Sequence, residues 1–337
     1  MREGQRTTRE ADGHLASVDS LRGIAALSVA MYHMAANSFL GGTLLERISR
    51  HGHLGVEAFF VISGYVIPRN LASRSATRAD IPRFLLARWL RLYPPYLAAM
   101  TLVVVLQYAS SIAPGFQGSA PHFSALQLAS NATLSCGLTG APWIGLVYWS
   151  LAIEAVYYPL VALCFPWIAS SRQPVRIATS LLWLAAPFTL VPQVLIVRYL
   201  GLFGIGIVIF QFRSGLVRNW QALLLVAVGT AATFVAMDLQ KALAGIVACA
   251  FLFAFGRVRW RFPLFLGSIS YSLYLIHVPV AGRVLNILRR FTDSHPARLA
   301  SYLAALGASL GAAYVFSRLV EAPSHRWSRR IRYGADS

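Results

Sequence analysis

Apolar runs of membrane-spanning length recur along almost the whole chain, and this pattern constrains the fold more than any single motif does. In lipid, every backbone polar group has to be paired within the protein, so only helices and closed barrels cross a bilayer. Runs of this length predict helices. About ten spans are expected: 21–40, 54–68, 84–107, 149–168, 175–197, 199–212, 220–236, 241–256, 262–282 and 299–320. We therefore predict an all-α polytopic membrane helix bundle of about ten transmembrane helices.

Composition and charge agree with a membrane protein. Of the 337 residues, 57% are apolar and 12% are charged, with a mean hydropathy of +0.58, which is unlike an ordinary soluble domain. The net charge of +18 comes from arginines in short turns between apolar runs. Such clusters indicate topology rather than a nucleic-acid-binding face, so no nucleic acid is expected as a partner.

The positive-inside rule predicts the orientation. If the N-terminus is cytoplasmic, most of the 30 Lys and Arg residues fall on the cytoplasmic side, which favours a multi-pass protein of the inner membrane with both termini in the cytoplasm. A patch of three residues falls on the opposite side: Arg289, Arg290 and Arg298. A cleavable signal peptide is the alternative interpretation of the first run, but cleavage would remove His33.

One membrane domain with short polar ends is the expected organisation. We predict a polar N-terminal tail over 1–17, the membrane domain over 18–323 and a basic C-terminal tail over 324–337. Residues 108–148 contain no charged side chain and are expected to form the main external loop. Within it, 123–139 is predicted as an interfacial or re-entrant helix, with an additional span as the alternative. The three cysteines lack metal or disulfide spacing, so neither a metal site nor a bound cofactor is predicted.

An arginine and a histidine share one face of the first span. Arg22 and His33 are eleven residues apart, which at about 100° per residue returns the second side chain to within roughly 20° of the first, about 16 Å along the axis. Arg22 then lies at the polar edge, and His33 lies near the middle of the membrane. Ionisable groups at that depth are costly and usually functional.

Two carboxylates lie inside apolar runs and therefore need a partner or a water-filled cavity. Gly64 lies on the same helical face as Glu57, seven residues away, where a ligand or another helix could approach closely. A simple helix-packing pair is the alternative. In the fourth span, Ser150, Glu154 and Tyr158 form one polar stripe at i, i+4 and i+8.

Three further groups of polar or aromatic residues have both a functional and a purely structural interpretation. Trp149 at a span end is an interface anchor or a ligand contact. Arg88 and Arg91 are one turn apart, where two guanidinium groups could bind neighbouring phosphates or simply anchor the inner membrane edge. The ninth span places three residues on one face, where hydrogen bonding between helices is the default role: Ser270, Tyr274 and His277.

Together these motifs resemble the acyltransferase-3 family, whose members modify surface polysaccharides, lipopolysaccharide, lipo-oligosaccharides and some antibiotics. The resemblance extends from about Ser17 to Pro323, with Glu57 and Tyr65 where the family often has Asp and Phe. Its six signals, in order, are Asp19-Ser-Leu-Arg22-Gly before His33, Gly55-Val-Glu-Ala-Phe-Phe-Val-Ile-Ser63-Gly-Tyr65, Arg88-x-x-Arg91, Trp149-Ser-Leu-x-x-Glu154, Ser270-Tyr-Ser-Leu-Tyr-Leu-x-His277 and Glu321-x-Pro323.

The resemblance implies an enzyme that moves an acyl group, commonly acetyl, from acyl-CoA as co-substrate to a hydroxyl of a carbohydrate or glycoside acceptor. The expected base is His33, oriented by Glu154 or, as the less favoured alternative, by Glu57. The expected donor-binding residues are Arg22, Arg88, Arg91, Ser63 and Gly64. The expected acceptor-binding or supporting residues are Trp149, Ser150, Tyr158, Ser270, Tyr274 and His277.

Two other classes of function remain as alternatives. Buried His and Glu side chains also occur in proton-coupled membrane transporters, although no paired halves indicate inverted repeats. In a non-catalytic anchor protein, the same side chains would only pair with one another. The sequence does not identify the acceptor, the acyl chain, the side of the membrane where transfer ends, an acyl-enzyme intermediate or the oligomeric state.

Overall fold

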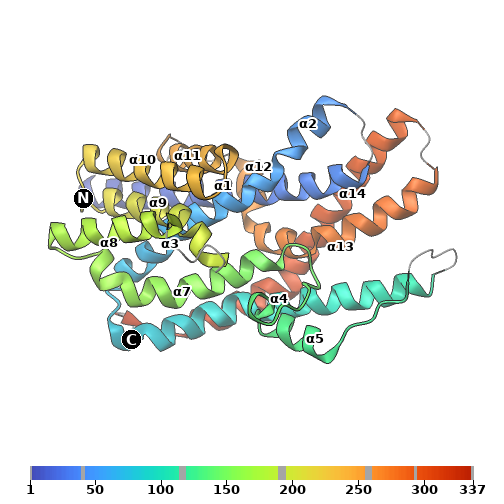
Figure 1. The fold of residues 1–337 in the computed structure, drawn as a ribbon, viewed down its shortest axis with the longest axis horizontal. Coiled ribbons are helices and arrows are strands. Elements are labelled where there is room, and N and C mark those ends of the chain that lie inside the picture. The colour runs from blue at the N-terminus through green and yellow to red at the C-terminus, as the bar shows by residue number, and fades with distance from the viewer. Residues whose placement is uncertain are drawn as a thin grey trace.

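The computed structural model describes residues 2–38, 42–113, 119–188, 195–254, 260–291 and 294–334. These residues form helices joined by turns, with no strand among them, so the all-α prediction is confirmed (Figure 1). The main helices are α1 (Arg2–Ser38), α2 (Leu44–Arg50), α3 (Gly55–Ser73), α4 (Ile81–Ser111), α5 (Ala125–Ala132), α6 (Cys136–Thr139), α7 (Tyr148–Ile168), α8 (Gln173–Ala185), α9 (Leu195–Arg213), α10 (Asn219–Ala236), α11 (Leu239–Ala254), α12 (Arg261–Ser268), α13 (Ser270–Leu288), α14 (His295–Phe316) and α15 (Ala322–Arg330).

Within the described ranges, six helical segments are long and apolar enough to cross a membrane, and they include α4, α7, α9, α10, α13 and α14. Helix α11 is apolar but shorter. The protein is therefore a multi-pass membrane protein, and the number of about ten spans stays a prediction. Parts of the predicted spans 21–40, 175–197 and 241–256 lie outside the described residues.

Two predicted boundaries differ from the observed helices, and the predicted interfacial or re-entrant helix is divided into two short ones. Helix α1 begins at Arg2, so the predicted tail over 1–17 is largely the first part of that helix; the segment has no proline and is rich in helix-forming residues. The predicted span over 262–282 is divided at Ile269 into α12 and α13. Residues 123–139 form α5 and α6, which are both too short to span a bilayer.

The predicted C-terminal tail begins as a helix that packs on α4. Pro94 and Pro95 have no N–H group, so the carbonyls of Leu90 and Arg91 lack their usual helical donors. The Ser324 hydroxyl donates to both of these carbonyl oxygens, at 3.0 Å in the case of Arg91. The proline pair in one helix thus creates the attachment site for α15.

The C-terminus and the arginine-rich segment 69–83 lie at the same end of the bundle. The Tyr333 hydroxyl donates to Asn70 Oδ1 at 2.6 Å, and the Gly334 amide donates to Asp80 Oδ1 at 3.1 Å. Helix α1 also begins at this end, which we call the terminal end (Figure 1). Helices α2 and α5 lie toward the opposite end, which we call the loop end.

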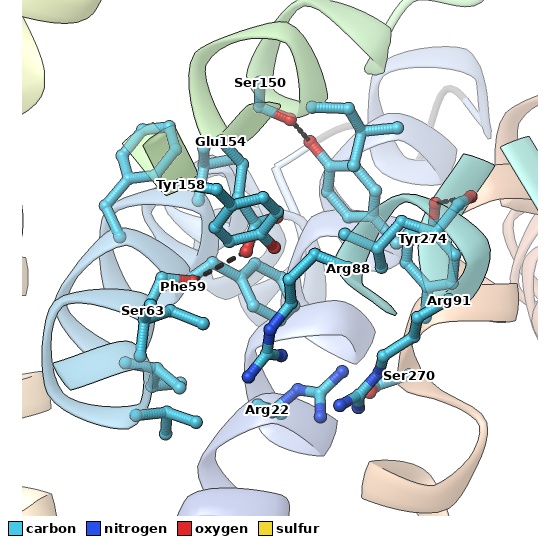
Figure 2. Close-up of a pocket in the computed structure, with 18 of the residues that line it drawn as sticks. Arg22, Phe59, Ser63, Arg88, Arg91, Ser150, Glu154, Tyr158, Ser270 and Tyr274 are labelled. Atoms are coloured by element: carbon cyan, nitrogen blue, oxygen red, sulfur yellow. Dashed lines mark hydrogen bonds between the residues drawn. The ribbon is translucent and has the colours of Figure 1, made fainter. Parts of the chain in front are cut away.

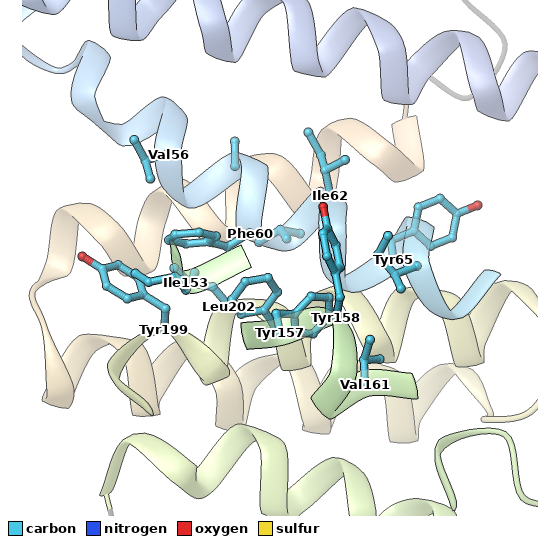
Figure 3. Close-up of a cluster of buried hydrophobic side chains, with 14 of the residues drawn as sticks. Val56, Phe60, Ile62, Tyr65, Ile153, Tyr157, Tyr158, Val161, Tyr199 and Leu202 are labelled. Carbon is cyan, nitrogen blue, oxygen red and sulfur yellow. The ribbon is translucent and has the colours of Figure 1, made fainter. Parts of the chain in front are cut away.

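Aromatic side chains fill the core between α3, α7 and α9 (Figure 3). Tyr157 stacks on Phe203 with ring centroids 4.0 Å apart, and Phe60 packs beside them. Helices α3 and α9 can cross closely because Gly64 and Gly206 have no side chains. A Cβ atom at Gly64 would lie 2.2 Å from the Phe203 carbonyl oxygen, and Gly206 faces α3 in the same way. The next residue of α7, Tyr158, lines the cavity described below.

Candidate active site

A cavity of about 840 Å³, its open mouth included, lies between α1, α3, α4, α7 and α13. These helices come from both halves of the sequence, and each supplies polar side chains to the cavity. Nine predicted site residues line it: Arg22, Ser63, Arg88, Arg91, Ser150, Glu154, Tyr158, Ser270 and Tyr274. The structure therefore brings together most of the residues that the motifs singled out.

Three arginines gather at one side of this cavity. Figure 2 shows the guanidinium groups of Arg22, Arg88 and Arg91 grouped together, although they come from α1 and α4. Arg22 is placed there by the close crossing of α1 and α12, where a Cβ atom at Gly23 would lie 2.5 Å from the Gly267 amide nitrogen. Like charges this close repel, so the site favours a ligand with several negative charges.

A buried carboxylate that we did not predict as part of the site supports these arginines. Glu321 interacts electrostatically with Arg22 and Arg91. Its carboxylate accepts a 2.5 Å hydrogen bond from Ser272 and lies 3.5 Å from His325 Nε2. Glu321 is one of only 12 acidic residues in the chain and is buried in a π-helical turn, η5 (Ser317–Glu321). The closing motif Glu321-x-Pro323 was the signal that the sequence did offer.

The opposite wall holds the predicted carboxylate of α7. Ser63 Oγ donates to Glu154 Oε1 at 2.8 Å, and Tyr158 lies beside this carboxylate (Figure 2). The Arg88 guanidinium lies 6.0 Å from the Tyr158 ring centroid and 5.5 Å from that of Phe84. The cavity thus has a cationic side and a carboxylate side, which suits a ligand that carries both phosphate and hydroxyl groups.

Tyr274 closes the cavity toward the loop end. Its hydroxyl lies 2.5 Å from Ser150 Oγ and donates to the Val147 carbonyl at 3.2 Å. His277 follows one turn later on α13, with its ring centroid 6.2 Å from that of Tyr274. The two predicted histidines therefore lie just beyond this end of the cavity rather than in its lining.

His33 and His277 contact each other across α1 and α13. The Nδ1 atom of His33 lies 3.1 Å from Nε2 of His277 and 3.0 Å from the Val29 carbonyl oxygen. The Nδ1 atom of His277 lies 2.9 Å from the Leu273 carbonyl oxygen. Carbonyls only accept, so both Nδ1 atoms are assigned as protonated, and Nε2 of His277 accepts from His33. In a neutral His33 with this tautomer, Nε2 is the basic nitrogen of the ring.

Burial distinguishes the two rings. His277 is completely buried, whereas His33 is half-buried. A substrate can therefore approach His33 but not His277. The geometry suits His33 for proton transfer and suits His277 for fixing the orientation and tautomer of the neighbouring ring.

Besides the two histidines, three predicted site residues lie away from the cavity lining. Gly64 faces α9, so close helix packing accounts for a glycine at this position. Glu57 is buried, with no hydrogen-bond partner for its Oε2 atom among the described residues; its charged neighbours are Lys241 and Asp238. Trp149 packs against Tyr199 with ring centroids 5.7 Å apart.

The structure also separates the expected carboxylate partner from the expected base. Glu154 contacts Ser63 inside the cavity, whereas His33 contacts His277 beyond Tyr274. The sequence pattern left His277 as a helix-packing residue or as a support. The spacing of residues along single helices could not show that His277 of α13 meets His33 of α1.

In this helical membrane protein, a cavity lined by three arginines and a pair of histidines beyond Tyr274 lie in one bundle. The family model described as "Acyltransferase domain" matches residues 15–318. The chain therefore belongs to the acyltransferase-3 family, and the predicted resemblance is confirmed.

Curated relatives match only parts of the chain. Acyltransferase MdmB of Streptomyces mycarofaciens is 30% identical over 184 residues, which cover 51% of this chain and 43% of that protein. Peptidoglycan O-acetyltransferase OatA of Listeria monocytogenes is 30% identical over 30% of this chain and 15% of its own length. The matches thus span less than half the length of these relatives. No solved structure matches the chain.

Proposed function

We propose that this protein is an O-acyltransferase that moves an acyl group, in the first instance acetyl, from acyl-CoA to a hydroxyl of a carbohydrate or glycoside. Membership of the acyltransferase-3 family supports the class of reaction. The observation that carries the proposal is the placement of a triple-arginine cavity next to a pair of histidines in one bundle.

The arginines account for donor binding. A CoA molecule has a diphosphate and a further phosphate, and the guanidinium groups of Arg22, Arg88 and Arg91 form a matching set of donors. Glu321 holds part of this cluster in place. The thioester lies at the far end of the pantetheine arm, so a donor anchored at the arginines extends toward Tyr274 and, once that side chain moves, toward His33.

The chemical step uses His33 as general base. The acceptor oxygen attacks the thioester carbonyl carbon, and its proton passes to Nε2 of His33 as the new C–O bond forms. The C–S bond then breaks, and the imidazolium returns the proton to the CoA thiolate. His277 keeps the proton of His33 on Nδ1 throughout, because its own Nδ1 is committed to the Leu273 carbonyl.

The proposed orientation places the terminal end in the cytoplasm of a cell bounded by an inner membrane. That end includes the arginine-rich segment 69–83 and the C-terminal segment, in accordance with the positive-inside rule. The donor side of the cavity then faces the compartment in which acyl-CoA is made.

The test uses the purified full chain in lipid nanodiscs with acetyl-CoA and a set of alkyl glucosides. We expect release of free CoA together with a glucoside whose mass has increased by one acetyl group. Proton uptake without CoA release would indicate a transporter instead. Binding of acetyl-CoA without turnover of any acceptor in the set, including polysaccharide fragments, would oppose the proposed reaction.

A further inference from the structure

A second cavity, about 990 Å³ with its open side included, lies between α4 and α7. Its walls are mostly aliphatic and aromatic, and the helices that form it are candidate membrane spans. Leu86 and Trp89 on α4 and Ala155 on α7 are exposed there, so the cavity opens sideways from the bundle, where the bilayer lies. We call it the lateral groove.

The lateral groove joins the arginine cavity. The residues that line both include Arg88, Glu154, Tyr158 and Tyr271. A molecule that lies in the groove therefore has its inner end at a guanidinium and a carboxylate. Along α4 the groove extends from Leu85 to Tyr96, eleven residues or about 16 Å.

The outer part of this groove is fixed by the external loop. The hydroxyl of Tyr93 donates to the Ala132 carbonyl, and Tyr96 donates to the Asn131 carbonyl at 2.7 Å. Trp89 stacks on Tyr93 with centroids 4.7 Å apart, which continues an aromatic wall toward the membrane. These contacts hold the groove open as a preformed surface rather than a gap between mobile side chains.

Hydrocarbon alone gains little from such a groove, because lipid tails are as apolar as its walls. The polar end is what selects a ligand. Pro159 also lines the groove and has no N–H group, so the Ala155 carbonyl lacks its helical donor. A hydroxyl-bearing headgroup would supply a donor to this carbonyl and to Glu154, and neither gain is available to a plain alkyl chain.

We propose that the lateral groove binds the alkyl chain of an amphiphilic acceptor, a single-chain glycolipid, and delivers its sugar from the bilayer past Glu154 into the arginine cavity, from which its hydroxyl, like the donor thioester, reaches His33 once Tyr274 moves. This proposal deepens the proposed function, because it names the physical class of the acceptor. The acceptor enters from the membrane and the donor from the arginine side, so the two substrates do not share one entrance.

The first experiment is independent of turnover. The full chain in nanodiscs is exposed to dodecyl glucoside with a diazirine at the end of its chain, and the photolysis products are mapped by mass spectrometry. We expect adducts on Leu86 and Trp89, lost in Ala155→Trp, which fills the groove. They should persist in Val156→Trp, which adds the same ring to a neighbouring exposed position outside the groove.

Equal labelling of Leu86 and of the exposed Leu223 on α10, unaffected by Ala155→Trp, would show surrounding lipid only and would overturn the proposal. The second experiment compares acetyl transfer to dodecyl glucoside and to methyl glucoside. Wild type and Val156→Trp should prefer the dodecyl acceptor, and Ala155→Trp should lose this preference. Groove labelling without transfer would contradict the proposed function alone, whereas transfer without groove labelling would contradict the groove alone.

Discussion

His33 and His277 have different roles in the proposed proton transfer: His33 takes the proton, and His277 fixes the tautomer of His33. His277 is buried and bonded to its own helix at Leu273, whereas His33 remains accessible from one side. A neutral His277 can only accept from His33, so the pair fixes which nitrogen of His33 is basic. This role resembles that of the third member of a catalytic triad, with an imidazole where a carboxylate is usual.

The first prediction therefore concerns this pair. His33→Ala should lower the rate of acyl transfer by about 10²–10⁴-fold, because the general base is lost. His277→Gln keeps an acceptor toward His33 and should retain more activity than His277→Phe, which has none. Turnover of each purified variant is measured with acetyl-CoA. Near-normal turnover of His33→Ala, or equal activity of the two His277 variants, would contradict the assignment.

The second prediction concerns the arginines. Arg88→Lys and Arg91→Lys keep the positive charge but lose the fork-shaped donor geometry, so acetyl-CoA binding should weaken. The dissociation constant is measured by calorimetry on nanodisc samples. Arg69→Lys is the control, since Arg69 lies outside the cavity lining. Unchanged donor affinity in the first two variants would restrict Arg88 and Arg91 to a role in topology.

At the scale of helices, prolines and glycines determine how the elements around the site pack. Pro94 and Pro95 have no N–H group, so two carbonyls of α4 are left to accept from Ser324, and this contact attaches α15 to α4 next to Arg91. Because Gly64 and Gly206 have no side chains, α3 and α9 cross closely. This crossing positions Ser63 of α3 toward Glu154 of α7. The first effect also needs the Ser324 hydroxyl as donor, whereas the second needs only the two glycines.

The third prediction tests the helix crossing. Gly206→Val would place a Cβ atom 2.2 Å from the Val61 carbonyl oxygen, so α3 and α9 would have to separate. We expect a loss of about 1–3 kcal/mol in stability, as is typical of overpacking. Gly311→Val on α14 is the matched control, because no atom lies within 4 Å of its added Cβ. Thermal unfolding in detergent measures both, and equal melting temperatures would contradict the crossing.

At the scale of the molecule, the two ends differ in charge and in covering. The arginine-rich segment and the C-terminal segment pack together at the terminal end. The loop end carries α2, with Arg47 and Arg50, and the segment with α5 and α6, in which no Lys, Arg, Asp or Glu occurs. In the proposed orientation, the positive-inside rule accounts for the basic terminal end.

The fourth prediction tests this polarity. Cysteines placed singly at Ala79 and Ser119, both exposed, should react with an impermeant thiol reagent from opposite sides of the membrane. Cys136, Cys164 and Cys249 are first replaced by alanine. In intact cells only Ser119→Cys should be labelled, and Ala79→Cys should need opened vesicles. Labelling of both positions in intact cells would overturn the orientation.

The sequence predicted the class of fold and most of the cavity, because hydropathy and polar residues in apolar runs are local properties. Arg22, Arg88, Arg91 and Glu154 were found in this way. Contacts between helices were not predictable from spacing alone. The meeting of His33 with His277 depends on how α1 and α13 cross, and the position of Glu321 depends on how the turn after α14 packs on α13.

The distance along α1 between Arg22 and His33, about 16 Å at the helical rise per residue, has a consequence for the choice of donor. A rigid helix keeps this distance constant, so on the proposed function it measures the molecule that has to reach from one residue to the other. Small activated acyl compounds, such as acetyl phosphate, have their phosphate next to the reactive carbonyl and are too short to occupy both positions. Selection by length would thus favour acyl-CoA over short acyl donors such as acetyl phosphate, without any residue that recognises sulfur.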